Sequence, residues 1–170
     1  MKSNSGLSYD LLTVHLGMLL VHITKSGLML SRYIIQTWVP ASSSLPTELL
    51  AKGYKVIYST KDTWYLDHGF WGSTVYHNWR VVYDNKIPRK AGVLGGEACM
   101  WSELVDNQSL DMKVWPRTAA MAERLWTDPD GKSTSAEARF YRHRQRLVAR
   151  GIKANAVTPT YCYQNEGECQ

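Results

Sequence analysis

Three short apolar runs, separated by helical patterns, most constrain what this chain can fold into. Each run is rich in β-branched, aromatic or other apolar residues, which is typical of strands. The runs are nearly continuous rather than alternating, as expected for parallel strands buried on both faces. Strands joined by helical connections predict an α/β fold with a parallel sheet. The three runs are YIIQTW (33–38), YKVIYS (54–59) and AGVLGGEACMW (91–101).

Helical patterns with recognisable ends lie between and after these runs. Ser44 and Ser135 stand where an N-cap is expected, and Gly53 and Gly151 stand where a helix stops. Pro116 precedes a segment rich in Ala, Leu, Met and Glu, a composition that favours a helix. We expect helices within residues 44–53, 115–126 and 135–151, and a short helix or turn at 79–85.

The aromatic composition is the unusual feature of the chain. Its 170 residues suffice for one ordinary domain, and a net charge of +5 is mild. Seven Trp and ten Tyr stand against two Phe. Amphipathic aromatics in that excess suit a surface that binds a polar ring, such as a sugar or a base. A tryptophan-rich core explains the composition equally well, so the positions of these residues have to decide.

Cysteine usage suggests an oxidising compartment and no metal site. Cys162 and Cys169 bracket a short polar segment and can close a small disulfide loop. Cys99 lies in an apolar run, which favours a buried thiol. No CxxC or His-Cys spacing indicates zinc, and we expect no metal or cofactor. The sequon that begins at Asn107 is consistent with secretion, although such sequons are frequent by chance.

The first 31 residues have no assignment from the sequence. Residues 11–24 carry no Asp, Glu, Lys or Arg, but they are too short and too interrupted by His for a membrane span. They also make a poor signal peptide, because Asp10 precedes them and no small-x-small cleavage site follows cleanly. We interpret residues 1–31 as a weak targeting segment or as sequence foreign to the domain.

Aromatic and acidic residues gather where the predicted strands end. In open parallel sheets and barrels, ligands meet the carboxyl ends of the strands. An indole covers the apolar face of a pyranose, and a carboxylate accepts hydrogen bonds from neighbouring hydroxyls. The sequence therefore favours a saccharide site over a coincidence of packing. The candidate residues are Trp38 after the first strand, Trp64, Tyr65 and Asp67 after the second, and Trp101 and Glu103 after the third.

Five motifs, taken in order, resemble the C-terminal half of the β-N-acetylhexosaminidases of glycoside hydrolase family twenty, with the animal and insect branch most similar. They are YIIQTW, WYLDHG, GGEACMWSE, WPRTAAMAERLW and RHRQRLVARGI, and the resemblance covers residues 33 to about 163. It implies a (β/α)8 barrel that removes terminal β-linked GlcNAc or GalNAc from glycans or chito-oligosaccharides. The implied mechanism is substrate-assisted, with the 2-acetamido carbonyl of the sugar as nucleophile.

The resemblance also implies a role for each candidate residue. Tyr65 would hydrogen-bond the acetamido carbonyl, and Asp67 and Glu103 would bind hydroxyls of the terminal sugar. The walls of the pocket would be the indoles of Trp38, Trp64 and Trp101. The family's Asp-Glu catalytic pair has no counterpart, because no Asp-Glu dipeptide occurs in the sequence. We interpret Glu97 as a buried, hydrogen-bonded structural carboxylate rather than the missing acid.

The sequence therefore predicts that this chain forms about the last three strands of the barrel. As an isolated chain the barrel would be incomplete, and we expect the chain to be inactive alone. The predicted division is an unassigned segment 1–31, a partial catalytic barrel 32–152 and a tail 153–170. By resemblance, we expect the full-length protein to pass through the secretory pathway, to be secreted, lysosomal or membrane-associated, and to form a homodimer.

Two alternatives stay open at this point. One is a non-catalytic carbohydrate-binding remnant. The other is a nucleic-acid-binding helix formed by RFYRHRQRLVAR (139–150), although its arginines recur every three to four residues, as on the solvated face of an outer helix. We therefore expect no nucleic-acid partner.

Overall fold

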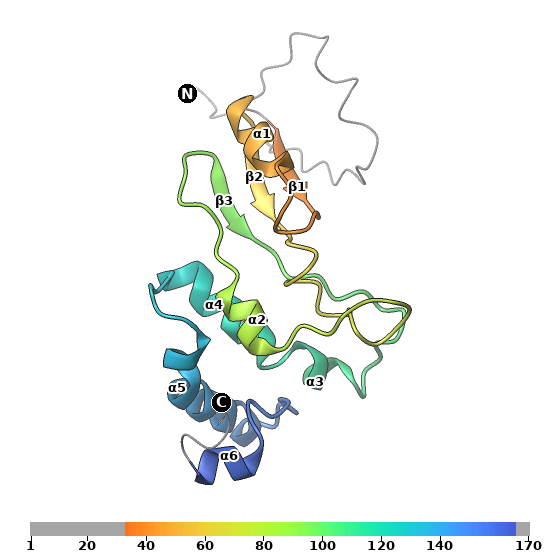
Figure 1. Cartoon of the computed structure of the whole chain (residues 1–170). Coiled ribbons are helices and arrows are strands. Elements are labelled where there is room, and N and C mark those ends of the chain that lie inside the picture. The colour runs from red at the N-terminus through yellow and green to blue at the C-terminus, as the bar shows by residue number, and fades with distance from the viewer. Residues whose placement is uncertain (1–32, 166–170) are drawn as a thin grey trace, which may run out of the picture.

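A computed structural model describes residues 33–165, which form a small parallel sheet followed by a group of helices (Figure 1). The sheet stands at one end of the molecule, and the C-terminal helices lie at the other end. The elements are β1 (Ile34–Thr37), α1 (Leu45–Ala51), β2 (Lys55–Tyr58), α2 (Trp79–Asp84), β3 (Val93–Gly96), α3 (Leu110–Val114), α4 (Arg117–Thr127), α5 (Ser133–Ala149) and α6 (Thr160–Gln164).

The sheet has the order β1-β2-β3 with both pairs parallel, so the predicted parallel α/β sheet is confirmed. Each of the first two strands lies within its predicted run. The third is shorter than expected, because its ladder to β2 shifts register after Val56 and ends at Gly96. Beyond that point only an isolated bridge between Tyr65 and Cys99 continues the pairing.

The larger of two hydrophobic clusters lies among the helices. Trp79 stacks on Phe140 at 4.6 Å between ring centroids, and its indole N–H donates to the Val157 carbonyl at 2.8 Å. Val157 lies beyond the predicted domain boundary at residue 152, yet it packs in this cluster. The buried members are Trp64, Leu66, Trp79, Val82, Tyr83, Ala120, Met121, Ala136, Phe140 and Val157.

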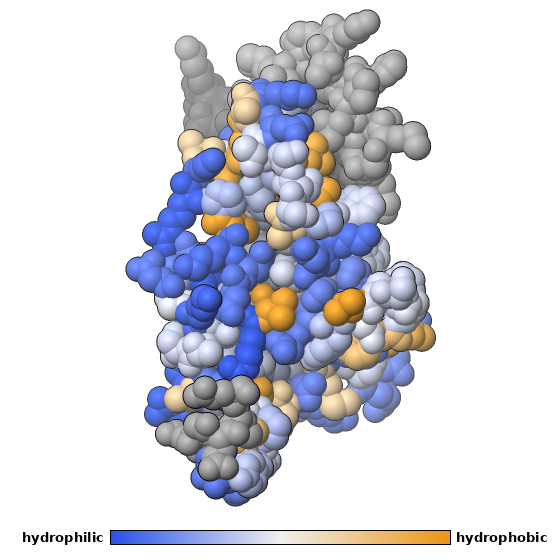
Figure 2. Space-filling view, viewed as in Figure 1, coloured by the Kyte–Doolittle hydropathy of each residue, from blue (hydrophilic) through white to orange (hydrophobic). Residues whose placement is uncertain are grey.

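The second cluster is much smaller and joins α1 to the sheet. Leu49, Tyr54 and Val56 form its buried part. Hydrophobic side chains are exposed around the sheet at the top of Figure 2, whereas the surface below it is mostly hydrophilic. Leu94 of β3, for example, is half exposed. The sheet region therefore buries fewer apolar side chains than the helical region.

The helix ends differ in part from the prediction. Ser44 precedes α1 but caps no backbone amide, because its hydroxyl donates to Glu48 Oε1 at 2.6 Å instead. α5 begins at Ser133, so Ser135 lies inside the helix and its hydroxyl donates to the Lys132 carbonyl at 2.7 Å. Gly53 and Gly151 follow their helices in the left-handed conformation, as a helix stop requires.

The structure bears in part on the sequence predictions about the cysteines and about a membrane span. Cys99 is a buried free thiol, as predicted. Cys162 is disulfide-bonded, but its predicted partner Cys169 and the segment 1–31 lie outside the described residues. Within residues 33–165, no helix is long and apolar enough to cross a membrane.

Candidate functional site

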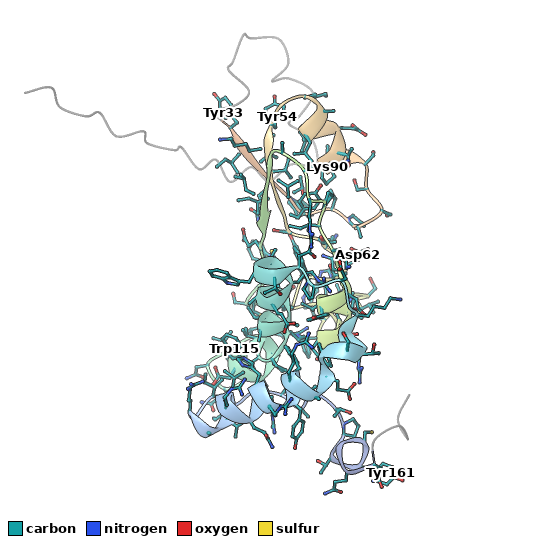
Figure 3. The ribbon with its side chains drawn as sticks, turned by 90° about the vertical axis from the view of Figure 1, so that its left-hand side faces the viewer. Tyr33, Tyr54, Asp62, Lys90, Trp115 and Tyr161 are labelled. Atoms are coloured by element: carbon teal, nitrogen blue, oxygen red, sulfur yellow. The ribbon has the colours of Figure 1, made fainter. Side chains whose placement is uncertain are left out.

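The candidate site lies where the strands end and the aromatic loop, residues 60–78, begins. Tyr33 and Tyr54 mark the opposite, amino-terminal edge of the sheet, and Asp62 lies within the loop on the far side from them (Figure 3). The loop is tied to the strand ends by hydrogen bonds such as Lys61 N–H to the Val39 carbonyl at 3.0 Å. The loop therefore starts from a fixed point at the carboxyl edge.

Tyr65 is held beside the segment that follows β3. The bridge to Cys99 is made by two backbone hydrogen bonds, from Leu66 N–H to the Cys99 carbonyl at 2.7 Å and from Cys99 N–H to the Trp64 carbonyl at 2.9 Å. The Tyr65 side chain is nearly buried and interacts with the thiol of Cys99 and the indole N–H of Trp101. The bridge thus brings together the loop and the stretch that carries Trp101.

The phenol of Tyr65 stays protonated at any physiological pH. Burial is the largest cause that raises the pKa of Tyr65, and the neighbouring Cys99 and Asp67 raise it further. The neighbouring Trp101 lowers the same pKa, but less than the other causes together raise it. A protonated phenol keeps its O–H as a donor. Tyr65 can therefore donate a hydrogen bond to a carbonyl oxygen of a ligand.

Asp67 contributes a carboxylate oxygen that the chain itself does not use. Its side chain is 2% exposed, and among the described residues Oδ1 has no hydrogen-bond partner. Most buried polar atoms in native proteins are paired, and an unpaired one is often explained by function. Asp67 is therefore suited to accept hydrogen bonds from a polar ligand.

Two buried histidines lie near Tyr65 in this cluster, and one of them, His68, directly follows Asp67 in the chain. The ring of His68 lies 5.2 Å from the Tyr65 ring and 5.9 Å from the His77 ring, centroid to centroid. Burial is the main cause that lowers the pKa of both histidines, and Asp67 opposes this for His68. Both rings are accordingly favoured in the neutral form near pH 7.

Trp38, Trp101 and Glu103 are exposed at the same edge. The two indoles are 37% and 47% exposed. Lys61 Nζ stands 5.6 Å from the centre of the Trp38 ring, a cation–π contact that occupies one of its faces. Glu103 lies in the turn after Trp101 and is exposed. These three side chains are open to solvent, unlike Tyr65 and Asp67.

The prediction of Trp64 as a pocket wall is wrong for this structure. Its side chain is fully buried, and its indole N–H donates to the Val82 carbonyl at 3.1 Å. The ring packs so closely on β3 that a Cβ added at Gly96 would lie 2.2 Å from Trp64 Cζ3. The indole faces α2 rather than the edge, so Trp64 is a core residue.

The prediction for Glu97 is also wrong. We expected a buried, hydrogen-bonded carboxylate within a strand, but Glu97 follows the end of β3 and its side chain is exposed. The strand is shorter than the apolar run that suggested it. The Glu97 carboxylate is a neighbouring charge that raises the pKa of Cys99, after burial as the main cause.

Sequence reasoning missed Arg117 and Arg124, the two largest fully buried charged side chains. They are 2% and 1% exposed and belong to α4. A signal was present: positions 117, 120, 121 and 124 recur at helical spacing, so both arginines share the buried face with Ala120 and Met121. An arginine on such a face must place its donors inside the protein.

Cavities alone do not identify the site. A cavity of about 620 Å³ lies at the β3 side of the sheet, lined by Ile57, Val93, Leu94 and Leu125 among others. None of the candidate residues lines it. Among residues 33–165, no group of His, Cys, Asp and Glu is arranged to hold a metal ion. The polar and aromatic cluster around Tyr65 and Asp67 is therefore the better candidate.

Comparison with known proteins assigns the chain to a family. A model described as "Glycosyl hydrolase family 20, catalytic domain" matches residues 20–129, and the match begins within the segment left unassigned above. The probable beta-hexosaminidase fdl of Drosophila melanogaster is 44% identical over 161 residues, which cover 82% of this chain and 24% of that protein. The chitooligosaccharidolytic beta-N-acetylglucosaminidase of Ostrinia furnacalis is 43% identical over 151 residues, covering 81% and 25%.

The fold agrees with this assignment. The crystal structure of a GH20 exo beta-N-acetylglucosaminidase from Vibrio harveyi superposes with a TM-score of 0.65 at 21% identity, over 75% of this chain and 22% of that one. The chain spans about a quarter of the length of the curated relatives it matches. Because the family model covers more than half of its residues, the chain belongs to glycosyl hydrolase family 20.

Proposed function

We propose that this chain is the sugar-holding part of a β-N-acetylhexosaminidase, an enzyme that releases terminal β-linked N-acetylhexosamine. The observation that carries the proposal is the cluster of Tyr65, Asp67 and Trp101, in a chain of family 20. A buried phenol donor, an unpartnered carboxylate oxygen and an exposed indole together match an acetamido group, ring hydroxyls and the apolar face of one sugar.

In this proposal the three strands are about the last three of a (β/α)8 barrel. A barrel of this kind has eight parallel strands, and its active site lies at their carboxyl ends. The parallel order β1-β2-β3 and the position of the cluster at the carboxyl edge support that placement.

The proposed chemistry assigns binding, and no proton transfer, to these residues. In a substrate-assisted reaction the acetamido carbonyl of the sugar is the nucleophile, and this family is an exception to the scheme with two enzymic carboxylates. The Tyr65 O–H donates to that carbonyl oxygen and orients it. Asp67 and Glu103 accept from hydroxyls of the same sugar, and Trp38 and Trp101 cover its ring.

We further propose that the 170-residue chain alone does not hydrolyse glycosides. Its sequence contains no Asp-Glu dipeptide, which is the family's catalytic pair by resemblance. The expected result is no release of chromophore from a chromogenic N-acetylglucosaminide by the purified chain, measured beside a full-length family member. Hydrolysis that co-purifies with the chain and is lost in Tyr65→Phe would overturn this part of the proposal.

Sugar binding is tested by titrating GlcNAc and, as a matched ligand without the acetamido group, glucose. Tryptophan fluorescence gives the affinity, and saturation transfer to the acetamido methyl protons shows which part of the sugar is in contact. We expect GlcNAc to bind and glucose to bind at least about tenfold more weakly. Equal responses to the two sugars, or none to either, would contradict a site for N-acetylhexosamine.

Variants assign that binding to the cluster. Removing one hydrogen bond in Tyr65→Phe is expected to weaken GlcNAc binding about two- to tenfold. Asp67→Asn removes the charge that strengthens hydrogen bonds to sugar hydroxyls, so we expect it to weaken GlcNAc binding at least as much as Tyr65→Phe does. Trp126→Phe is the control, because that indole is 88% exposed on α4 and belongs to no part of the proposed site.

The proposed setting of the full-length protein is the secretory pathway. The disulfide bond of Cys162 supports an oxidising compartment. Assembly as a homodimer stays a prediction from the family resemblance, and size-exclusion chromatography with light scattering on the full-length protein tests it.

A further inference from the structure

Arg117 is a buried charge that binds backbone carbonyls instead of a carboxylate. Its guanidinium donates to the carbonyl of Leu66 at 2.6 Å, of His77 at 2.9 Å and of Lys113 at 2.9 Å. Among the described residues it forms no ion pair, although it is 2% exposed. A buried charge is costly unless its donors are used, so these three bonds are tightly constrained in geometry.

Two of the three carbonyls are the two ends of one loop segment. Leu66 and His77 flank residues 67–76, which include Asp67 and run out from the helices beside the stretch after β3 (Figure 1). The guanidinium also stands 4.9 Å from the centre of the Tyr76 ring, at the far end of the same segment. We call these contacts the loop clamp, because one side chain on α4 holds both ends of the segment.

The clamp acts directly on the backbone that leads into Asp67. The Leu66 N–H donates to the Cys99 carbonyl at 2.7 Å, and the Leu66 carbonyl accepts from Arg117. The residue before Asp67 is thus held on one side by the strand bridge and on the other by α4. Within the segment, Gly69 passes so close to Tyr76 that a Cβ there would lie 2.4 Å from the Tyr76 Cα.

Charge adds to this geometry. Asp67 is buried with an unpartnered oxygen, and a buried carboxylate without partners is unfavourable. The two residues are close enough to affect each other: burial lowers the pKa of Arg117, while Tyr76 and Asp67 raise it. The positive guanidinium therefore compensates part of the cost of holding Asp67 in place without using its free oxygen.

We propose that Arg117 is a positioning residue of the candidate sugar site: by clamping both ends of the loop segment 67–76 it sets the place and the charge environment of Asp67. This inference rests on the proposed function for its link to sugar, whereas the clamp itself is independent of any ligand. Arg117 touches no sugar in this proposal and acts through Leu66, His77 and Asp67.

Arg124 offers a matched control on the same helix, two turns further along. It is also buried, and it donates to the carbonyls of Tyr83 at 2.8 Å and Pro129 at 2.6 Å. It also stands 4.7 Å from the centre of the Tyr83 ring, as Arg117 does at Tyr76. It binds no part of the segment 67–76. A lysine at either position keeps the charge and loses the planar fork that reaches several carbonyls.

The experiment compares the full 170-residue chain with its Arg117→Lys and Arg124→Lys variants. Hydrogen exchange by mass spectrometry is followed in peptides covering residues 67–76 and, separately, residues 128–131. We expect Arg117→Lys to speed exchange in 67–76 at least about tenfold, and Arg124→Lys to leave that segment near the wild-type rate. Faster exchange in 67–76 to the same extent in both variants would overturn the clamp and leave a general loss of stability.

A wild-type measurement decides the question if a variant fails to fold. In the clamp, Leu66 and His77 are held by α4, so the hydrogen-bonded amides at the start of the segment should be protected together with that helix. These are His68 N–H, bonded to the Tyr65 carbonyl at 3.3 Å, and Gly69 N–H, bonded to Thr74 Oγ1 at 2.9 Å. Free exchange at these two amides beside a protected α4 in the wild type would overturn the proposal.

GlcNAc titration then tests the link to the site. We expect Arg117→Lys to weaken GlcNAc binding at least about tenfold and Arg124→Lys to change it less than about twofold. Wild-type binding that is unchanged in Arg117→Lys would overturn positioning of the site even if the exchange result holds. Absence of binding in the wild type contradicts the proposed function instead, and the exchange result still decides the clamp.

Discussion

The helical region and the carboxyl edge of the sheet differ in whether their polar side chains are hydrogen-bonded within the protein. Among the helices, Tyr83, Glu123 and Arg139 form a closed network, with the Tyr83 hydroxyl donating to Glu123 Oε1 at 2.8 Å and Arg139 bound to the same carboxylate. At the edge, one Asp67 oxygen has no partner among residues 33–165, and the Trp101 ring is exposed. The helical region pairs its polar side chains with one another, and the edge leaves polar and aromatic side chains available to a ligand.

This contrast shows that the residues that stabilise the fold and the residues of the candidate site lie in different regions of one short chain. The larger hydrophobic cluster lies among the helices, and within residues 33–165 the smaller one contains three buried residues. The two regions are joined by α4, whose buried face carries both arginines. Substitutions in each region should therefore act on different measured quantities.

The largest expected effect comes from the centre of the helical region. Trp79→Ala removes a stacked, hydrogen-bonded indole and should lower the free energy of unfolding by about 3–5 kcal/mol. Urea unfolding followed by circular dichroism measures it. Trp126→Ala is the control, because an 88% exposed indole should change the free energy by less than about 0.5 kcal/mol. An equal fall in the free energy of unfolding in the two variants would contradict the assignment of Trp79 to the core and of Trp126 to the surface.

The next effect tests the contact where the two regions meet. Gly96→Ala places a methyl group against the Trp64 ring, and such overpacking should cost about 1–3 kcal/mol. The clashing atoms belong to the six-membered part of the indole, so Trp64→Phe in the same chain should relieve much of the strain. A double-mutant cycle by urea unfolding measures the coupling. Additive losses from the two substitutions would mean that the ring and the strand do not constrain each other.

An intermediate effect concerns pH and the buried histidines His68 and His77. Burial holds the pKa of His68 and of His77 below the ordinary value of 6.5. As pH falls, the unfolded chain therefore binds protons before the folded chain does, and stability that is fully present above pH 6.5 decreases below it. His143 acts in the same direction, since burial and Arg146 lower its pKa.

The measurement is the urea unfolding midpoint at pH values above and below 6.5. We expect a lower midpoint at the lower pH, and a smaller drop in the double variant His68→Gln, His77→Gln, in which His143 still contributes. A midpoint that does not depend on pH across this interval, or the same drop in the double variant, would show that burial does not lower the pKa of these two rings in the folded chain.

The smallest expected effect is at the edge itself. Lys61→Gln removes a cation 5.6 Å from the centre of the Trp38 ring, and such exposed pairs contribute about 0.5–1 kcal/mol. The free energy of unfolding should fall by no more than that, while GlcNAc gains access to a second face of the indole. A loss as large as that of Gly96→Ala would indicate that Lys61 supports the loop rather than only the ring.

The strands and most helices could be predicted because they depend on local pattern. The apolar runs at 33–38 and 54–59 each contain a strand, and Gly53 and Gly151 follow helices as predicted. Hydrophobic runs and turn glycines are local properties, so tertiary contacts change them little. The short helix α3 was not predicted, since five residues carry too little periodicity.

The errors at the candidate site have a common physical cause. Trp64 and Tyr65 are adjacent, so their side chains point to different places, and composition alone does not say which of them faces the core. The packing of the Trp64 ring on Gly96 decides it. The continuous apolar run predicts that Glu97 lies within a strand. In the structure the pairing of β3 with β2 shifts register after Val56 and ends at Gly96, one residue before Glu97. Both depend on contacts between distant segments.

The exposure of Trp126 has a practical consequence for every optical measurement on this chain. Buried indoles such as Trp64 and Trp79 emit from a dry environment, whereas Trp126 is surrounded by water. Red-shifted, iodide-quenchable emission will therefore come largely from Trp126 and from the half-exposed rings of the edge. Replacing Trp126 with Phe removes that background and leaves a solvent-facing signal from Trp38, Trp71 and Trp101. Two of these three indoles belong to the candidate site, so the change in their emission reports directly on whether a ligand covers it.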